Sequence, residues 1–317
     1  MENQPKPIFL VTDKVPDALL SEIENTGYTV EYREAILNDH LAGLIGNYTG
    51  IIVNTAMKLD AFMLSLASKL KYILRPGSGL DNIDLKYCYE NDIKVFNSPE
   101  ANADAVGCHT LGLLLGLSRH IVSAHQALTV GLWQRRISTG DDFRGKCIGL
   151  IGYGNTGSAT ARYMAGLGAE IAVYDKYKTI TDTSVKQVEL DYLYENAEVL
   201  SLHIPLNSET NHWIDLDFLK QFQRPIYLIN TSRGYIMNTK QLPEALDTGL
   251  LKGVALDVLE NEKIANYSLQ ETEWLARMLA DPRVIITPHI AGWTHTARHE
   301  IFMTVWRKFL DWKAENN

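Results

Sequence analysis

A glycine-rich loop in the middle of the chain limits the folds it can adopt more than any other feature. The sequence GYGNTG (residues 152–157) follows the apolar run CIGLI (147–151) and precedes a helical pattern over residues 158–166. A strand, a G-x-G-x-x-G loop and a helix in this order begin a βαβ unit of a parallel sheet. The sequence therefore predicts a doubly wound α/β fold here.

The loop and the acidic residue after the next strand candidate predict a dinucleotide site. Gly152 would allow the tight turn, Gly154 would let the backbone approach a pyrophosphate, and Gly157 would let helix and strand pack closely. The N-terminus of the helix would offer N–H groups to the phosphates, and Asn155 and Thr156 of the loop are expected cofactor contacts. A glycine turn without a ligand is the plainer alternative. Asp175, at the end of the strand candidate 171–174, argues against it.

Asp175 also predicts which cofactor binds. Its carboxylate can accept hydrogen bonds from ribose hydroxyls and would repel a 2′-phosphate, so NAD is expected rather than NADP. The neighbouring Lys176 weakens this exclusion slightly.

Strand and helix patterns alternate along the chain in two series. Strands are predicted at 8–11, 29–32, 50–53, 72–74 and 94–96, then at 147–151, 171–174, 199–202, 226–229, 254–256 and 284–286. Helical patterns include 16–24, 59–70 and a long helix from about 103 to 125 between the two series. Nearly continuous apolar strands separated by helices indicate parallel sheets covered on both faces. The predicted class is α/β, with two doubly wound parallel-sheet domains.

Composition narrows the functional classes. The formal net charge of −8 over 317 residues argues against a nucleic-acid-binding surface. Apolar runs are too short for a membrane span, and the N-terminal MENQPKPIFLVTD lacks a signal-peptide pattern. Cys88, Cys108 and Cys147 show neither a disulfide framework nor metal-ligand spacing, so we expect no metal and a reducing cytoplasm.

Three polar side chains follow strand candidates of the second series. Arg233 lies in LINTSRG (228–234), Asp257 ends VALD (254–257), and His289 ends TPH after the strand 284–286. Ligands of doubly wound sheets bind beyond the carboxyl ends of the strands. Arginine can bind a carboxylate with two parallel hydrogen bonds, and histidine exchanges protons near neutral pH. Each residue alone is more often structural, but the trio beside a dinucleotide loop predicts a dehydrogenase.

Seven motifs in order make the chain resemble a known family. It is similar to NAD-dependent D-2-hydroxyacid dehydrogenases of the D-3-phosphoglycerate dehydrogenase-like type. The motifs are RPGSGLDNID (75–84), NSPEANADAV (97–106), GKCIGLIGYGNTG (145–157), LHIPL (202–206) with Thr210, NTSRG (230–234), ALDVLENE (255–262) and TPHIAG (287–292). The resemblance implies a flavodoxin-like substrate domain, 1–101 plus 290–317, and a Rossmann NAD-binding domain, 102–289. It also implies a homodimer.

The resemblance assigns roles to individual residues. Arg233 would bind the substrate carboxylate, His289 would exchange the proton with the substrate oxygen, and Glu262 rather than Glu260 would hydrogen-bond His289. Asp257 would hold the nicotinamide carboxamide. Further cofactor contacts are expected from His203, Pro205, Thr210, Thr231 and Ser232, and substrate contacts from Asn54, Arg75 and the N–H groups of Gly77 and Ser78.

Departures from the family pattern bear on the substrate. Phosphoglycerate-specific relatives tend to have Arg and Ser where this chain has Asn54 and Thr55, so a phosphate would depend on Arg75. Relatives commonly have Glu at Cys108. We expect a buried thiol there, with a redox role as the lesser alternative.

Three functions therefore remain open. The first is an active dehydrogenase for a small D-2-hydroxy or 2-oxo acid, and the second is D-3-phosphoglycerate dehydrogenase proper. The third is a catalytically idle NAD(H)-sensing protein resembling the family's corepressors. Retention of Arg233, Glu262 and His289 favours an enzyme over the sensing protein.

Overall fold

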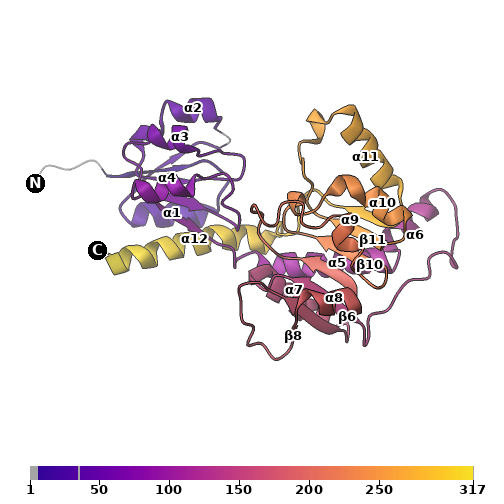
Figure 1. Ribbon diagram of the computed structural model, residues 1–317. Helices are drawn as coiled ribbons and strands as arrows, with labels where there is room; N and C mark the ends of the chain where they lie inside the picture. The colour runs from indigo at the N-terminus through magenta and orange to yellow at the C-terminus, as the bar shows by residue number, and fades with distance from the viewer. Residues whose placement is uncertain (1–5, 35, 317) are drawn as a thin grey trace, which may run out of the picture. The chain divides into compact units, whose positions relative to one another are not determined.

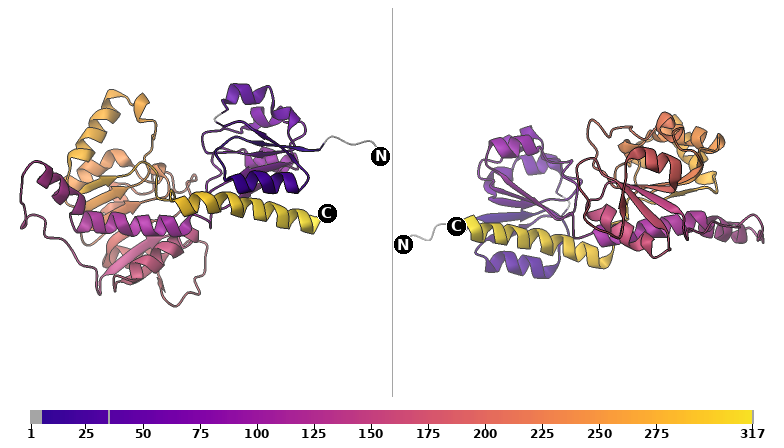
Figure 2. Two further views of the ribbon diagram at one scale, coloured as in Figure 1. Left: turned by 180° about the vertical axis from the view of Figure 1, so that it is seen from behind. Right: turned by 60° about the horizontal axis from the view of Figure 1, so that its bottom comes forward.

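The two predicted series of strands form two separate parallel sheets. The computed structural model (Figures 1 and 2) describes residues 6–34 and 36–316. The chain divides into unit 1, Met1–Asn102 with Trp293–Asn317, and unit 2, Ala103–Gly292. The prediction of two parallel-sheet α/β domains is confirmed.

Unit 1 contains a five-stranded sheet in the order β2-β1-β3-β4-β5, with every neighbouring pair parallel. This is the strand order of flavodoxin-like folds. Its elements are β1 (Ile8–Val11), α1 (Asp17–Asn25), β2 (Thr29–Tyr32), α2 (Asn38–Ala42), η1 (Ile45–Asn47), β3 (Gly50–Ile52), α3 (Ala61–Ser65), β4 (Tyr72–Arg75), α4 (Leu85–Glu90), β5 (Lys94–Asn97) and α12 (His295–Asn316).

Side chains of unit 1 alternate between two apolar layers, as strand geometry requires. Leu10, Ile51 and Ile73 pack with residues of α2, α3 and α4 on one face. Phe9 and its neighbours on the other face pack with α1 and with the C-terminal helix α12, which contributes Trp306 and Phe309. The last segment of the chain therefore belongs to the core of the first sheet.

Unit 2 contains a seven-stranded parallel sheet in the order β12-β11-β10-β9-β6-β7-β8. Its first strand, β6, lies between β7 and β9, which makes β6 the switch point of a Rossmann-type sheet. Its elements are α5 (Ala103–Ser118), α6 (Ile121–Thr129), β6 (Cys147–Ile151), α7 (Asn155–Ala165), β7 (Glu170–Tyr174), β8 (Lys186–Gln187), α8 (Leu190–Asn196), β9 (Ala197–Leu202), α9 (Leu216–Leu219), β10 (Ile226–Asn230), η2 (Gly234–Ile236), η3 (Thr239–Gln241), α10 (Leu242–Asp247), β11 (Leu251–Leu256), η4 (Ile264–Asn266), α11 (Leu269–Ala280) and β12 (Val284–Ile286).

Helices cover both faces of this second sheet. Leu114 of α5 and Met164 of α7 pack with Ile148 and Leu150 of β6 on one face. Residues of α8, α9, α10 and α11 pack with Cys147 and the alternate strand residues on the other. Because both faces are buried, polar side chains of the strands can reach solvent mainly at the strand ends.

Two predicted helices differ from the structure. The helix predicted from 103 to 125 ends at Ser118, and α6 starts at Ile121 after a bend of 57°. The chain turns at His120, whose φ is +54°, and the Ser118 carbonyl accepts the N–H of Asp141. This tertiary contact takes an acceptor that a continuous helix would use. The pattern 59–70 contains only the short α3, which Asp60 caps by accepting the Met63 N–H.

Cys108 is exposed on α5, so the expectation of a buried thiol is wrong. In the described part of the chain, no single helix is long and apolar enough to cross a membrane. The bent pair α5 and α6 passes that test only when the two helices are taken together.

Candidate active site

The predicted catalytic residues of unit 2 follow three adjacent strands. Arg233 lies just beyond β10, Glu262 lies in the segment after β11, and His289 lies just beyond β12. β10 pairs with β11 and β11 with β12, all in parallel. Their carboxyl ends therefore meet at one edge of the sheet.

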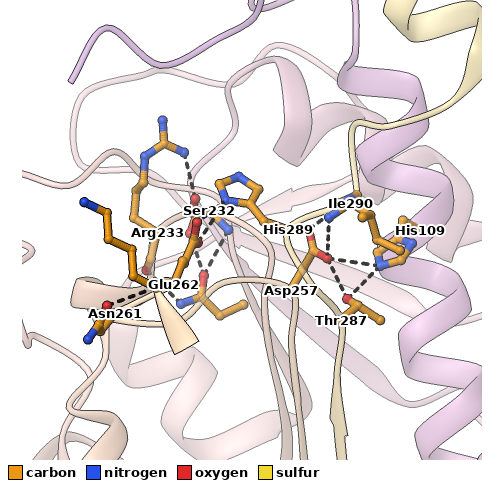
Figure 3. Close-up of polar contacts among 12 residues, drawn as sticks. His109, Ser232, Arg233, Asp257, Asn261, Glu262, Thr287, His289 and Ile290 are labelled. Atoms are coloured by element: carbon orange, nitrogen blue, oxygen red, sulfur yellow. Dashed lines mark hydrogen bonds and ion pairs between the residues drawn. The ribbon is translucent and has the colours of Figure 1, made fainter. Parts of the chain in front are cut away.

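His289 and Glu262 form a hydrogen-bonded pair at this edge (Figure 3). The ring Nδ1 of His289 lies 2.9 Å from Oε1 and 3.0 Å from Oε2 of Glu262. Both side chains are 46% exposed. Glu260 has different partners: its Oε1 accepts the N–H and hydroxyl of Thr239. With Nδ1 engaged, Nε2 is the ring nitrogen left for a substrate oxygen.

Asp257 lies on the buried side of the turn that presents His289. Its Oδ1 accepts the Thr287 hydroxyl at 2.5 Å and the Ile290 N–H at 2.9 Å, and its Oδ2 accepts the Ala291 N–H at 2.7 Å. The backbone carbonyl of Asp257 accepts the His289 N–H. Asp257 thus holds the turn from both its side chain and its backbone, while His289 adopts a φ of +55°.

The charge of Asp257 is maintained by these donors. Burial opposes the charged form, but the His109 ring, the Thr287 hydroxyl and the two N–H groups together hold the pKa of the Asp257 carboxyl below its ordinary value. Only 1% of Asp257 is exposed. The structure therefore assigns this carboxylate to holding the turn, and its predicted contact with a nicotinamide carboxamide stays a prediction.

His109 of α5 completes the buried side of the turn. Its Nε2 lies 3.2 Å from Thr287 Oγ1 and 3.6 Å from Asp257 Oδ1. Since the single hydroxyl proton of Thr287 goes to Asp257, His109 must be the donor in its contact with Thr287. Sequence reasoning missed His109, because the helical pattern does not show that this residue faces a strand end 178 positions later in the chain.

Arg233 is presented by a turn that Asn230 organises. Asn230 Oδ1 accepts the N–H and hydroxyl of Ser232, and its Nδ2 donates to the Arg233 carbonyl. Arg233 Nη1 donates to the Ser232 carbonyl at 2.8 Å. Thr231 lies 3.2 Å, oxygen to oxygen, from Thr110 of α5. Asn230 is the residue that folds the motif NTSRG, a role that its place at a strand end could have indicated.

The glycine loop has the geometry expected of a dinucleotide site. Gly152 has a φ of +96°, and a Cβ there would collide with the His203 carbonyl oxygen. A Cβ on Gly157 would collide with the Gly152 carbonyl oxygen. Beside Gly154 a Cβ would meet no heavy atom within 4 Å. The two ends of the loop are thus tightly packed and its middle is open, with exposed Asn155 and half-buried Thr156 beginning α7.

Asp175 lies at the end of β7, next to this loop. Burial opposes its charge, yet the N–H groups of Tyr153, Tyr177 and Lys178 hold the pKa of the Asp175 carboxyl below its ordinary value. The carboxylate is therefore ionised where ribose hydroxyls would bind. These features fit a bound NAD: glycines and a helix N-terminus for the pyrophosphate, and an acid for the ribose.

The segment after β9 provides the remaining predicted cofactor residues. His203 is buried, its Nε2 lies 2.9 Å from Ser201 Oγ, and burial lowers its pKa to about 3, so the ring is neutral. Pro205 is exposed, and its carbonyl accepts the Thr210 hydroxyl at 2.7 Å. Thr210 therefore shapes this loop, and its contact with a cofactor remains a prediction.

The four substrate residues predicted in unit 1 have local partners. Asn54 Oδ1 accepts the N–H groups of Ala56 and Met57. Arg75 is only 7% exposed and donates to the Pro76 carbonyl. The Gly77 N–H donates to Ser98 Oγ at 2.9 Å, because β4 and β5 end side by side, so a substrate carboxylate would have to compete for it. Half-buried Ser78 donates its hydroxyl to Asn102.

No group of three or more His, Cys, Asp or Glu side chains suited to a metal ion occurs among residues 6–34 and 36–316.

Comparison with known proteins identifies relatives along almost the whole chain. Residues 111–291 match the family described as D-isomer specific 2-hydroxyacid dehydrogenase, NAD binding domain. A hydroxypyruvate reductase of Thermotoga maritima is 34% identical over 289 residues, which is 91% of this chain and 92% of that protein. A glyoxylate reductase of Thermofilum pendens is 34% identical over 253 residues, 77% of this chain and 72% of that protein.

A solved structure is also similar to this chain in its fold. The D-lactate dehydrogenase of Aquifex aeolicus, complexed with NAD and lactic acid, superimposes with a TM-score of 0.82. It is 25% identical and covers 97% of this chain and 96% of its own.

Proposed function

Because the chain belongs to the D-isomer specific 2-hydroxyacid dehydrogenase family, we propose that it reduces a small 2-oxo acid, such as hydroxypyruvate or glyoxylate. The chain is an NAD-linked oxidoreductase for 2-hydroxy and 2-oxo acids, as its relatives establish. The single observation that supports the catalytic assignment is the bond of His289 Nδ1 to both oxygens of Glu262 at 2.9 and 3.0 Å.

His289 acts as the proton donor in reduction. When bound, NADH supplies the hydride that reaches the carbonyl carbon. Glu262 accepts a hydrogen bond from Nδ1–H, which fixes the orientation of the ring and leaves Nε2–H to protonate the carbonyl oxygen. In the reverse direction Nε2 takes the proton from the alcohol. Half exposure of both side chains lets the ring recover its proton from solvent.

Arg233 binds the substrate carboxylate and polarises the 2-oxo group. Its turn follows β10, which pairs with β11, the strand that precedes Glu262, and β11 in turn pairs with β12, the strand that precedes His289. A guanidinium matches a carboxylate with two parallel hydrogen bonds and keeps its charge at any physiological pH. Within unit 1, the Ser78 N–H stays a predicted substrate contact, and the Gly77 N–H already donates to Ser98 Oγ.

A plain 2-oxo acid is favoured over a phosphorylated one. Asn54 uses its side-chain oxygen to close a local turn, and Arg75 is buried within unit 1. Neither presents the exposed, paired hydrogen-bond donors that a phosphate selects. D-3-phosphoglycerate dehydrogenase proper therefore ranks second, and an idle NAD(H)-sensing protein third, because the His289–Glu262 pair is intact.

The test is NADH oxidation followed at 340 nm with glyoxylate, hydroxypyruvate, pyruvate and 3-phosphohydroxypyruvate. We expect turnover with at least one plain acid and a lower kcat/KM with the phosphorylated one. Glycolaldehyde, which lacks the carboxylate, should be a poor substrate because Arg233 has nothing to bind. A preference for the phosphorylated acid would select the second candidate. Tight NADH binding without any turnover would select the sensing protein.

We also propose a homodimer formed through α6 and the segment after it. None of the residues of α6 is buried, and large apolar side chains are exposed at Ile121, Val122, Leu128, Val130, Leu132, Trp133 and Ile137. Apolar surface of this extent is typical of an interface. Light scattering should give twice the chain mass, and Trp133→Asp should shift the species toward the monomer.

A cytoplasmic location is proposed from the cysteines. Cys88, Cys108 and Cys147 are all free, and burial raises the pKa of Cys88 and Cys147 to about 11 in each case. Free thiols are typical of a reducing compartment.

A further inference from the structure

Two loops beside the glycine loop are linked by an ion pair. Lys176 and Tyr177 follow β7, and Glu209 follows β9. Lys176 Nζ lies 2.5 Å from Glu209 Oε2, and the Tyr177 hydroxyl donates to the same oxygen at 3.0 Å. Because β6 lies between β7 and β9 in the sheet, these contacts connect the loops on the two sides of the dinucleotide motif.

The backbone on both sides of the link is held in place. Asn207 Oδ1 accepts the N–H groups of Glu209 and Thr210. On the other side, Asp175 Oδ1 accepts the N–H groups of Tyr177 and Lys178, both at 3.0 Å. Lys176, and then Tyr177, lower the pKa of the Glu209 carboxyl, so it is ionised at neutral pH.

The ion pair with Glu209 engages the ammonium group of Lys176, which could otherwise bind the 2′-phosphate of NADP. Sites for NADP place a positive side chain beside the residue at the end of the second strand, where the 2′-phosphate lies. Lys176 and Lys178 stand at that place here. Lys178 Nζ donates to the Tyr153 carbonyl at 2.9 Å, and Lys176 is paired with Glu209. Both ammonium groups therefore have partners inside unit 2.

We propose that Glu209 is a second determinant of cofactor choice, which keeps Lys176 from binding a 2′-phosphate and so reinforces the exclusion of NADP by Asp175. The proposal rests on the proposed function only in requiring that the chain bind a nicotinamide dinucleotide. From the sequence alone, Lys176 weakens the selectivity for NAD. The contact with Glu209 explains how the chain tolerates a lysine there.

The test is direct binding of NADH and NADPH by calorimetry, without substrate. Glu209→Gln should lower the ratio of the Kd for NADPH to the Kd for NADH about two- to fivefold, the size of one exposed charge interaction. The effect should be larger in an Asp175→Ala background, where the 2′-phosphate is no longer repelled. It should shrink as salt is raised, because exposed charges are screened.

Two further variants separate this role from a general charge effect. Adding Lys176→Met to Glu209→Gln should cancel the gain in NADPH binding. Asp217→Asn, which breaks the exposed ion pair with Lys220 elsewhere in unit 2, should leave the ratio unchanged. Normal NADH binding with an unchanged ratio in Glu209→Gln, in both backgrounds, would overturn the role of Glu209 alone. Failure of the unaltered protein to bind either nucleotide would overturn the proposed function as well.

Discussion

The two sides of the turn after β12 use carboxylates in opposite ways. Asp257 is 1% exposed, and protein donors occupy both of its oxygens. Glu262, five positions later in the chain, is 46% exposed and bonds the ring of His289. Figure 3 shows Asp257 with Thr287 and His109 in one group, and Glu262 with His289 in the other.

This difference separates holding the turn from exchanging a proton. A buried carboxylate with protein donors on both oxygens stabilises one backbone geometry and has little acceptor capacity left for a ligand. A half-exposed carboxylate contributes little to stability but can orient a ring that must gain and lose protons. Changes on the exposed side should therefore reduce turnover and leave stability intact, and changes on the buried side should reduce stability first.

The largest effect is expected from His289→Asn. Loss of the proton donor should lower kcat about a hundred- to ten-thousandfold, while NADH affinity and the melting temperature stay near those of the unaltered protein. The matched control is His299→Asn, since His299 is also an exposed histidine beside a glutamate, Glu300. Steady-state kinetics and thermal melting measure both properties. Unchanged turnover in His289→Asn would remove this residue from the mechanism.

Glu262→Gln should have the next largest effect. Loss of a charged hydrogen-bond partner of His289, worth about 1.5–3 kcal/mol, predicts a fall in kcat of about ten- to a hundredfold. Glu260→Gln is the control. It also removes one carboxylate charge, two positions before Glu262, but the Glu260 side chain bonds Thr239 and not His289. Equal losses of turnover in the two variants would show that the charge of the segment, and not the bond to His289, is what matters.

The exposed side of the turn could be predicted from the sequence, and the buried side could not. Continuous apolar runs indicated β10, β11 and β12, and parallel topology places the residues after these strands at one edge of the sheet. Arg233 and His289 can be found in this way, and the family resemblance adds Glu262. Whether Asp257 points into the protein depends on side-chain packing at the strand end, which no spacing reveals.

Contacts between segments far apart in the chain explain the other differences. At the break near His120 the Ser118 carbonyl accepts the N–H of Asp141, and no Gly or Pro occupies residues 118–121. The bond from Gly77 to Ser98 joins the ends of two neighbouring strands. Periodicity describes only which face of an element is apolar, so such pairings between elements lie outside its reach.

Asp257→Asn should destabilise the fold more than it alters the chemistry. The amide would point an N–H group at a backbone N–H or at the Thr287 hydroxyl, which predicts a loss of about 1–3 kcal/mol in the free energy of unfolding. Chemical denaturation measures it, and exposed Asp217→Asn should change stability by less than about 0.5 kcal/mol.

The difference in stability between the unaltered protein and Asp257→Asn should depend on pH. The pKa of Asp257 is lowered in the folded protein, so the unfolded chain binds its proton more readily. The stability that the charge contributes is present above the ordinary carboxyl pKa of about 3.9 and is lost as the pH falls below it. The gap in stability between the unaltered protein and Asp257→Asn should therefore narrow below about pH 4. A gap that widens in acid would contradict the assigned sign.

The smallest effect is expected from His109, which supports Asp257 through Thr287. His109→Leu removes the donor to the Thr287 hydroxyl and should cost about 0.5–1.5 kcal/mol of stability, whereas His109→Gln keeps an amide N–H in reach and should recover part of it. Because His109 and Asp257 act on the same hydroxyl, the losses of His109→Leu and Asp257→Asn should not add. Additive losses would contradict a shared role of His109 and Asp257 at the Thr287 hydroxyl. A fall in kcat as large as that of Glu262→Gln would mean that His109 takes part in the chemistry directly.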